Sequence, residues 1–234
     1  VGVEVGTELA FMHAAKMNVP LIMAMNQLDH EKANFDEQVK ALKDNFGEKV
    51  TLIQYPVNAG VGFDSFVDLM MLKMYKYPKG GGKAEIVDIP ASEKDKVEQL
   101  RLTLVENAAS GADDLMEKYF DSGELTIEEI RRGLRLGIAS RAVFPVLCIS
   151  AKENIGVDRM MEFMTNNVPS PNESLCGLTY KENNEKVKYD ETKDTVLFVF
   201  KTANESHIGE ITFMKVAQGE IATGQDVINS VNGS

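Results

Sequence analysis

Two uninterrupted apolar runs stand out along the chain, at residues 20–25 and 144–149. A strand that is covered on both faces of a parallel sheet reads as such a run, whereas a half-exposed strand alternates between apolar and polar positions. A mostly apolar segment at residues 50–55 predicts a third strand. Because helical patterns separate these segments, the sequence predicts an α/β fold built on a parallel sheet.

The helices between these strands are predicted from apolar positions at helical spacing. One predicted helix covers residues 7–17, and a second covers residues 30–46 with Phe35, Val39, Leu42 and Phe46 along one face. A later helix, from about 157 to 166, is expected to bury Val157, Met161 and Met164. Its methionines are interpreted as core filler, because a flexible thioether side chain suits irregular gaps.

The region between about residues 56 and 143 has a different character, with glycine-rich turns followed by three helical patterns. Helices are predicted from residue 92, over 112–120, and after Thr126, which forms a Thr-x-x-Glu capping box with Glu129. These helices each carry one apolar stripe, so we expect them to pack on one another and on a small sheet. The region is therefore interpreted as an α+β subdomain inserted into the parallel-sheet domain.

The glycine run at residues 77–83 invites a phosphate-loop interpretation, which the spacing excludes. A phosphate loop needs a Gly, four residues, and then Gly-Lys-Ser/Thr. Here Tyr77 stands five positions before Gly82, and Lys83 is followed by Ala84. We therefore interpret the run as a turn between two short strands.

Beyond the Pro-Ser-Pro segment at 169–171, the apolar period changes to two. Strands are predicted at residues 195–201 and 208–216, joined by a polar turn. We interpret residues 172–234 as the beginning of an antiparallel β-barrel domain that is incomplete in this chain. Because an unclosed barrel leaves sheet edges unpaired, we expect this part to be the least stable.

Polar residues follow directly after both long apolar runs. Asn26 and Asp29 follow the first run, and Ser150, Ala151 and Lys152 follow the second. Ligands of parallel sheets bind beyond the carboxyl ends of the strands. An ionised Asp offers only acceptors, which suits paired N–H donors such as those on a guanine edge, and small residues let a backbone approach a base. Taken alone, Asn-x-x-Asp is also common in ordinary turns.

The segments that surround these residues resemble the elongation factor G family of translational GTPases, in order and in spacing. The Asn-Gln-x-Asp sequence at 26–29 is similar to the guanine-reading Asn-Lys-x-Asp element of GTP-binding proteins. The other matching segments are residues 1–8, 33–36, 114–119, 145–148 and 169–171. The inserted region is similar to the subdomain that this family carries inside its nucleotide-binding domain. The resemblance thus implies a partial GTP-binding domain over residues 1–170, followed by the second domain of a translation factor.

Carried over to this sequence, the resemblance implies that Asn26 and Asp29 contact guanine, that Ser150 and Ala151 close around its oxygen, and that Lys152 flanks the base. Gln27 departs from the family, because a lysine is usual at its position. Losing that charge predicts weaker nucleotide binding, since charge-assisted contacts are roughly twice as strong as neutral ones.

The resemblance also implies GTP or GDP as the ligand, with Mg²⁺ in the complete protein, where its ligands and the phosphate loop lie outside these residues. No catalytic residue and no metal ligand is expected in this chain itself. The chain is interpreted as a piece of a longer cytoplasmic protein that hydrolyses GTP on the ribosome during translocation. Two alternatives remain open, a ribosome-binding relative with slow GTP turnover and a ribosomal-protection or release-type relative.

Composition limits the partners of the chain. The 234 residues carry a formal charge of -11, which argues against a free-standing nucleic-acid binder. Ribosomal RNA and ribosomal proteins are therefore expected to be bound through the complete protein. The cluster Arg131, Arg132, Arg135 and Arg141 is interpreted as a solvated helix face. The three histidines lack the spacing of metal ligands. No apolar run is long enough to cross a membrane. The piece is expected to be monomeric.

Overall fold

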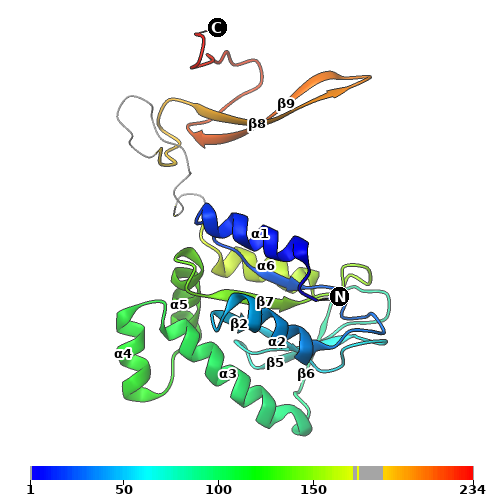
Figure 1. Ribbon diagram of the computed structural model, residues 1–234. Helices are drawn as coiled ribbons and strands as arrows, with labels where there is room; N and C mark the ends of the chain where they lie inside the picture. Colours follow the sequence, from blue (N-terminus) through cyan, green and yellow to red (C-terminus); the bar gives the residue numbers. More distant parts are fainter. Residues whose placement is uncertain (1, 171–172, 174–186, 234) are drawn as a thin grey trace. The chain divides into compact units, whose positions relative to one another are not determined.

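The computed structural model describes residues 2–170, 173 and 187–233, and the chain divides into two compact units, Val1–Pro169 and Ser170–Ser234 (Figure 1). The helices of the first unit are α1 (Val5–Lys16), α2 (Phe35–Phe46), α3 (Lys94–Ala109), α4 (Asp113–Ser122), α5 (Ile127–Ala139) and α6 (Val157–Asn167). A single 3₁₀ turn, Ala91–Glu93, precedes α3.

A three-stranded parallel sheet lies at the centre of the first unit. Its strands are β1 (Met23–Met25), β7 (Phe144–Cys148) and β2 (Val50–Leu52), in the order β1-β7-β2. All residues of β7 are buried, as expected for the middle strand of a covered parallel sheet. The predicted α/β fold with a parallel sheet is therefore confirmed.

The predicted strand at residues 50–55 is two strands in two different sheets. The chain leaves the parallel sheet at Ile53 and enters an antiparallel sheet as β3 (Gln54–Pro56). Because β2 ends there, the Cys148 N–H of β7 finds no strand partner on the side where β2 had run. The buried side chain of Gln54 accepts it through Oε1 at 2.8 Å. A polar residue inside an apolar run thus marks the exchange between sheets.

The inserted region forms the antiparallel sheet β3-β4-β5-β6 together with α3, α4 and α5. Its further strands are β4 (Ser65–Asp68), β5 (Lys73–Lys76) and β6 (Glu85–Val87). The glycine run lies in the turn between β5 and β6, as predicted. The predicted capping box is also confirmed, because Thr126 Oγ1 accepts the Glu129 N–H at 3.3 Å and Glu129 Oε2 accepts the Thr126 N–H at 2.8 Å.

Two helix predictions are corrected. The helix predicted from residue 30 begins only at Phe35, because the side chain of Asn34 caps it by accepting the Glu37 N–H at 3.3 Å. In α6, Met161 and Met164 are exposed instead of buried, at 57% and 40%. The face that α6 buries consists of Phe163 and Asn167, with Met160 packed partly against the core.

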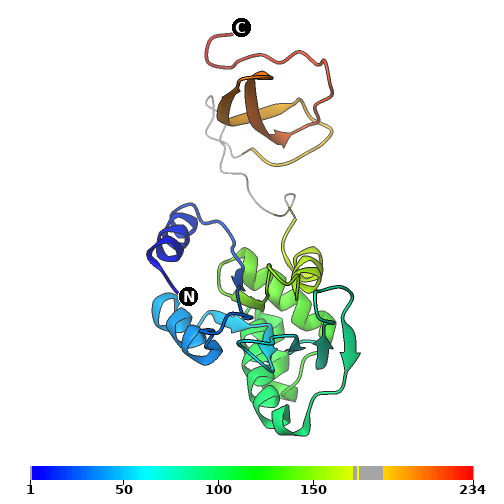
Figure 2. The same ribbon diagram turned by 90° about the vertical axis from the view of Figure 1, so that its right-hand side faces the viewer.

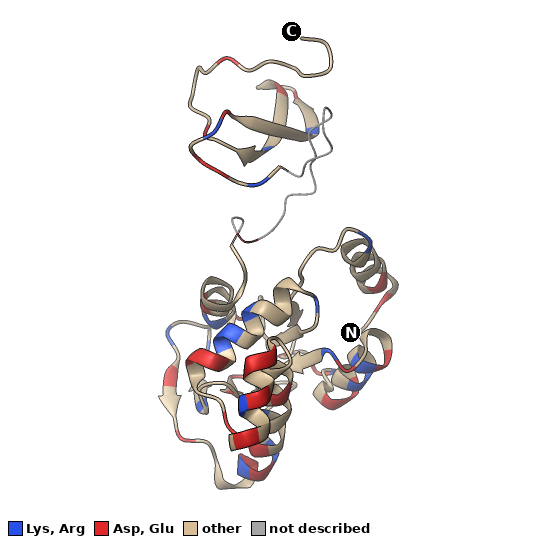
Figure 3. Ribbon diagram, turned by 90° about the vertical axis from the view of Figure 1, so that its left-hand side faces the viewer, with Lys and Arg blue, Asp and Glu red and all other residues tan. Residues whose placement is uncertain are grey.

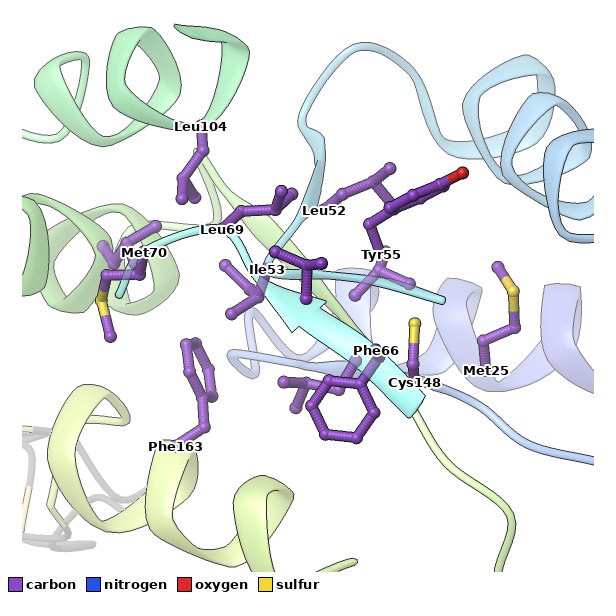
Figure 4. Close-up of a cluster of buried hydrophobic side chains, with 14 of the residues drawn as sticks. Met25, Leu52, Ile53, Tyr55, Phe66, Leu69, Met70, Leu104, Cys148 and Phe163 are labelled. Carbon is purple, nitrogen blue, oxygen red and sulfur yellow. The ribbon is translucent and has the colours of Figure 1, made fainter. Parts of the chain in front are cut away.

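One hydrophobic core joins the parallel sheet to the inserted region. Figure 4 shows Leu104 of α3, Phe66 of β4 and Phe163 of α6 gathered around the strands that carry Met25 and Cys148. Phe66 and Leu104 are fully buried. The inserted region is therefore not a loosely attached module, and its packing reaches the strand ends at which a ligand is expected.

The second unit contains two long strands, β8 (Val196–Glu205) and β9 (Gly209–Gln218), which pair as an antiparallel hairpin. The predicted strands therefore exist, and both extend further than the sequence pattern indicated. Phe198, Phe200 and Phe213 remain exposed on this hairpin. That residues 172–234 begin a β-barrel domain remains a prediction, and the segment 174–186 lies outside the described residues.

Candidate functional site

The carboxyl ends of β1 and β7 lie side by side. Met25 pairs with Cys148, the last residue of β7. The pairing continues beyond the strands, since the Ile149 N–H donates to the Met25 carbonyl at 3.0 Å and the Leu28 N–H donates to the Ile149 carbonyl at 3.4 Å. The two loops that carry the candidate site residues therefore begin from adjacent, hydrogen-bonded strands.

Asn26 connects these two loops directly. Its Oδ1 accepts the Gln27 N–H at 2.8 Å and the Ala151 N–H at 3.0 Å. The side chain therefore shapes its own turn and also holds the turn that follows β7. A guanine oxygen that approaches Ala151 would have to share the N–H donor that Asn26 now occupies.

Asp29 is half-buried, and one of its oxygens lacks a partner. Its neighbour Leu28 is fully buried and its carbonyl accepts the Gly60 N–H at 2.7 Å, which fixes the backbone beside the carboxylate. Among the residues that the structure describes, Asp29 Oδ1 is buried with no hydrogen-bond donor. A buried carboxylate oxygen without a partner is costly, so this atom is suited to receive N–H groups from a ligand.

Ser150 closes the loop that follows β7. The Ser150 N–H donates to the Ile155 carbonyl at 3.0 Å, and the Ile155 N–H donates to the Ser150 carbonyl at 2.9 Å. The buried Ser150 hydroxyl accepts the Glu153 N–H at 3.2 Å. Residues 150–155, which we call the β7 loop, are thus a closed and internally bonded turn. Ser150 shapes this turn, and Ala151 presents its backbone at the surface of the loop.

Gln27 and Lys152 are exposed, as are Asn26 and Ala151. Gln27 has a positive φ of 60°, a conformation that non-glycine residues adopt rarely. The Lys152 ammonium lies 3.5 Å from the Glu153 carboxylate, and its side chain is 81% exposed. The structure therefore brings Asn26 and Ala151 into contact, and it leaves the Lys152 side chain in solvent at the surface of the β7 loop.

A large cavity of the first unit lies beside the site and not between its two loops. It has a volume of about 660 Å³ between α1, β1 and α2. Asn26 and Gln27 line it, whereas Asp29 and residues 150–152 do not. Its walls are mostly apolar, including Phe11, Leu42 and Phe46. We therefore assign the base site to the two loops, because of the hydrogen bonds between them, and not to this cavity.

Metal-ligating side chains do not gather in the described parts of the chain. Among residues 2–170, 173 and 187–233, no group of three or more His, Cys, Asp or Glu side chains could hold a metal ion. No chemical step is assigned to a metal here. In the same residues, no helix has the length and apolar character that crossing a membrane requires.

The arginine cluster is not a free basic surface. Figure 3 shows acidic and basic residues mixed along the helices of the first unit. Arg132 forms a two-fold ion pair with Asp114, at 2.6 and 3.0 Å, and Arg131 pairs with Glu128 at 2.9 Å. Arg141 is almost fully buried, and its guanidinium lies over the ring of Phe144. The predicted solvated face holds for Arg132, which is exposed. Arg131 is half-buried although it pairs with Glu128, and Arg141 was wrongly placed on a solvated face.

Sequence reasoning missed one residue that supports the site. This residue is Gln54, whose side chain accepts the Cys148 N–H at the end of β7. Cys148 lies two residues before Ser150, so the hydrogen bond fixes the strand from which the β7 loop begins. The signal was present, because Gln54 is polar in the middle of an apolar segment. Its meaning depended on the exchange between sheets, which the pattern did not reveal.

Comparison with known proteins gives a family for the first unit and a fold match for most of the chain. The family model of the elongation factor Tu GTP-binding domain matches residues 1–170. A crystal structure of a protein from Thermus thermophilus superposes with a TM-score of 0.78 at 23% sequence identity, over 94% of this chain. The match covers 30% of that protein's chain, so this chain spans less than a third of its length. At this identity the likeness shows a common fold.

Proposed function

Because the chain belongs to the family of the elongation factor Tu GTP-binding domain, we propose that residues 26–29 and 150–152 form the guanine-recognition site of a translational GTPase similar to elongation factor G. Guanine nucleotide binding and an elongation-factor-like role follow from the family. The further elements of the proposal are GTP hydrolysis during ribosomal translocation, contacts to ribosomal RNA and proteins through the complete protein, and a cytoplasmic location.

One observation carries the proposal: two loops far apart in the sequence are joined by the Asn26–Ala151 hydrogen bond beside a buried, unpartnered Asp29 oxygen. Guanine presents two N–H groups on one edge, and a carboxylate accepts both. Adenine presents no such pair of donors. The Asp29 oxygen therefore supports selection of guanine over adenine.

Substitution of Asp29 by Asn tests this role through a change of base preference. An amide offers a donor where the carboxylate offered an acceptor, so Asp29→Asn should weaken GDP binding about 10- to 100-fold. Xanthine carries an oxygen where guanine carries the amino group, so the variant should bind xanthosine diphosphate more tightly than the wild type does. Both affinities can be measured by titration of the complete protein with each nucleotide.

The matched control is Asp44→Asn, which changes the same functional group at an exposed position on α2. It should leave both affinities unchanged. Equal affinities for GDP and xanthosine diphosphate in wild type and Asp29→Asn would overturn the proposal. For the isolated chain we expect no GTP hydrolysis, and turnover above background would contradict that expectation.

A second candidate function is a ribosome-associated relative in which GTP turnover is slow or dispensable. Gln27 favours it, because the usual lysine charge is lost from an exposed position beside the base site. Ribosome-stimulated hydrolysis by the complete protein discriminates the two functions. Stimulated turnover supports the translocation factor, whereas nucleotide binding without stimulated turnover supports the slow relative.

A further inference from the structure

The turn between β5 and β6, residues 78–83, packs against the backbone of the β7 loop. We call it the glycine turn. A Cβ atom added at Gly81 would lie 2.7 Å from the Glu153 carbonyl oxygen and 3.2 Å from the Asn154 Cβ. Gly81 is half-buried, whereas its neighbours Gly80 and Gly82 are exposed. The inserted region therefore touches the same loop that presents Ala151.

The base of this turn is anchored to the helix that follows the β7 loop. Tyr77 is 2% exposed, and its hydroxyl donates to Asp158 Oδ1 at 2.5 Å. Its N–H donates to the Asp64 carbonyl at 2.8 Å. Burial and the Asp158 carboxylate raise the pKa of Tyr77, so the hydroxyl keeps its proton and remains a donor. The glycine turn is thus held at its start by α6 and meets the loop at Gly81.

The far end of the β7 loop is held by the inserted sheet as well. A Cβ atom at Gly156 would lie 2.4 Å from the Cys148 carbonyl oxygen and 3.1 Å from the ring of Phe66 on β4. Gly156 also has a positive φ of 76°. Tyr77 packs near Phe66, with ring centroids 5.9 Å apart. The inserted region therefore encloses residues 153–156 from two sides.

We propose that Gly81 is a positioning residue for guanine binding. By allowing the glycine turn to contact the Glu153 carbonyl, it fixes the β7 loop and hence the direction of the backbone amides at residues 151 and 152. This inference rests on the proposed function, because it assigns the inserted region a role in base affinity. Gly81 touches no nucleotide and acts through the loop alone.

The chain provides a matched pair of variants for this test. Gly80 and Gly81 both have positive φ, 88° and 82°, so alanine strains the backbone similarly at either position. A Cβ atom at Gly80 meets nothing within 4 Å, whereas one at Gly81 meets the loop backbone. The difference between Gly80→Ala and Gly81→Ala therefore isolates the contact with the β7 loop.

The first measurement is amide hydrogen exchange in the 234-residue chain without ligand. In Gly81→Ala, exchange at Ala151 and Ile155 should accelerate, because their hydrogen bonds to Asn26 and Ser150 depend on the loop position. In Gly80→Ala, both amides should exchange as in the wild type. The urea midpoint of both variants reports any global destabilisation.

The second measurement is binding of GDP and inosine diphosphate. Gly81→Ala should weaken both about 3- to 10-fold relative to Gly80→Ala, since both bases keep the 6-oxygen that faces the β7 loop. Their affinity ratio should stay constant, because the 2-amino group that distinguishes them faces Asp29. If Gly81→Ala acted only by destabilising the whole chain, the strain shared with Gly80→Ala would weaken binding in both variants. An equal loss of GDP and inosine diphosphate affinity in Gly81→Ala alone therefore indicates the contact with the β7 loop.

The outcomes separate the two proposals. If the complete protein binds no GDP, the proposed function fails, and the exchange comparison in the 234-residue chain still decides whether Gly81 positions the loop. If the wild type binds GDP and the two alanine variants match in both exchange and affinity, the positioning role is overturned. A changed GDP-to-inosine ratio in Gly81→Ala would also overturn it, since the effect would then reach Asp29.

Discussion

The two flanks of the parallel sheet differ sharply in packing. On the inserted side, α5 buries Ile130, Leu134 and Ile138 and packs against α3. On the opposite side, α1 has no buried residue and lies at the margin of the unit (Figure 2). Its Leu9 and Met12 are 46% and 56% exposed, and residues of α1, β1 and α2 line the 660 Å³ cavity. Contact between α1 and α2 is made by Phe11, whose ring stacks on Phe46 with centroids 4.3 Å apart.

This difference explains why the two loops of the candidate site, residues 26–29 and residues 150–152, are held in different ways. Ala151 follows β7, which has strands on both sides and only buried residues. Asn26 and Asp29 follow β1, which pairs only with β7 among the residues that the structure describes. The first half is therefore fixed by the core, and the second half depends on hydrogen bonds to the first, above all the Asn26–Ala151 bond.

Truncation of one leucine on each flank should produce the largest contrast. Leu134→Ala removes a fully buried side chain and should cost about 2–5 kcal/mol of unfolding free energy. Leu9→Ala removes the same atoms from a half-exposed position and should cost less than about 1 kcal/mol. Urea unfolding of both variants measures the difference. Similar losses at the two positions would show that α1 is packed as firmly as α5.

Removal of Arg141 should loosen the exposed flank by a smaller amount. Its guanidinium donates to the Val19 carbonyl and lies 5.5 Å from the Phe11 ring centroid, so it ties α1 to the end of α5. Arg141→Ala should cost about 1–3 kcal/mol, because it removes a charged hydrogen-bond donor and the ring contacts of a nearly buried side chain. Hydrogen exchange should accelerate across α1 and remain unchanged in α3.

The control for this contrast is Arg141→Lys. Lysine keeps the positive charge and the long stem but lacks the planar fork that bonds a carbonyl while stacking on a ring. It should restore part of the lost stability. If Arg141→Ala leaves the exchange of α1 amides unchanged, the tether between the two flanks does not exist.

Much of the fold could be predicted because its signals are local. Apolar runs identified β1 and β7, and the Thr126–Glu129 spacing located the start of α5. The buried face of α6 was wrong because two adjacent stripes of that helix are apolar. Phe163 buries a large ring, so the helix turns toward it and exposes Met161. The sequence period alone cannot choose between two such stripes.

The candidate site likewise has a part that local signals predict and a part that depends on tertiary packing. Adjacent ends of parallel strands follow from the fold class, so the proximity of residues 26–29 and 150–152 could be predicted. The contributions of Gln54 and Gly81 could not, because both depend on where the inserted region packs. The failed phosphate-loop pattern at residues 77–83 left the glycines interpreted as a turn, and the contact of Gly81 with Glu153 appeared only in three dimensions.

The smallest expected effect concerns Gln27, on the weakly held half of the site. Gln27→Lys restores the family's charge at an exposed position whose backbone already has φ of 60°. A charged group interacts more strongly with a nucleotide than an amide does, so GDP affinity should rise about threefold. Gln99→Lys, which adds the same charge on an exposed part of α3, should leave affinity unchanged. Equal gains from both variants would indicate general attraction, and no gain from Gln27→Lys would mean that the missing lysine does not limit binding.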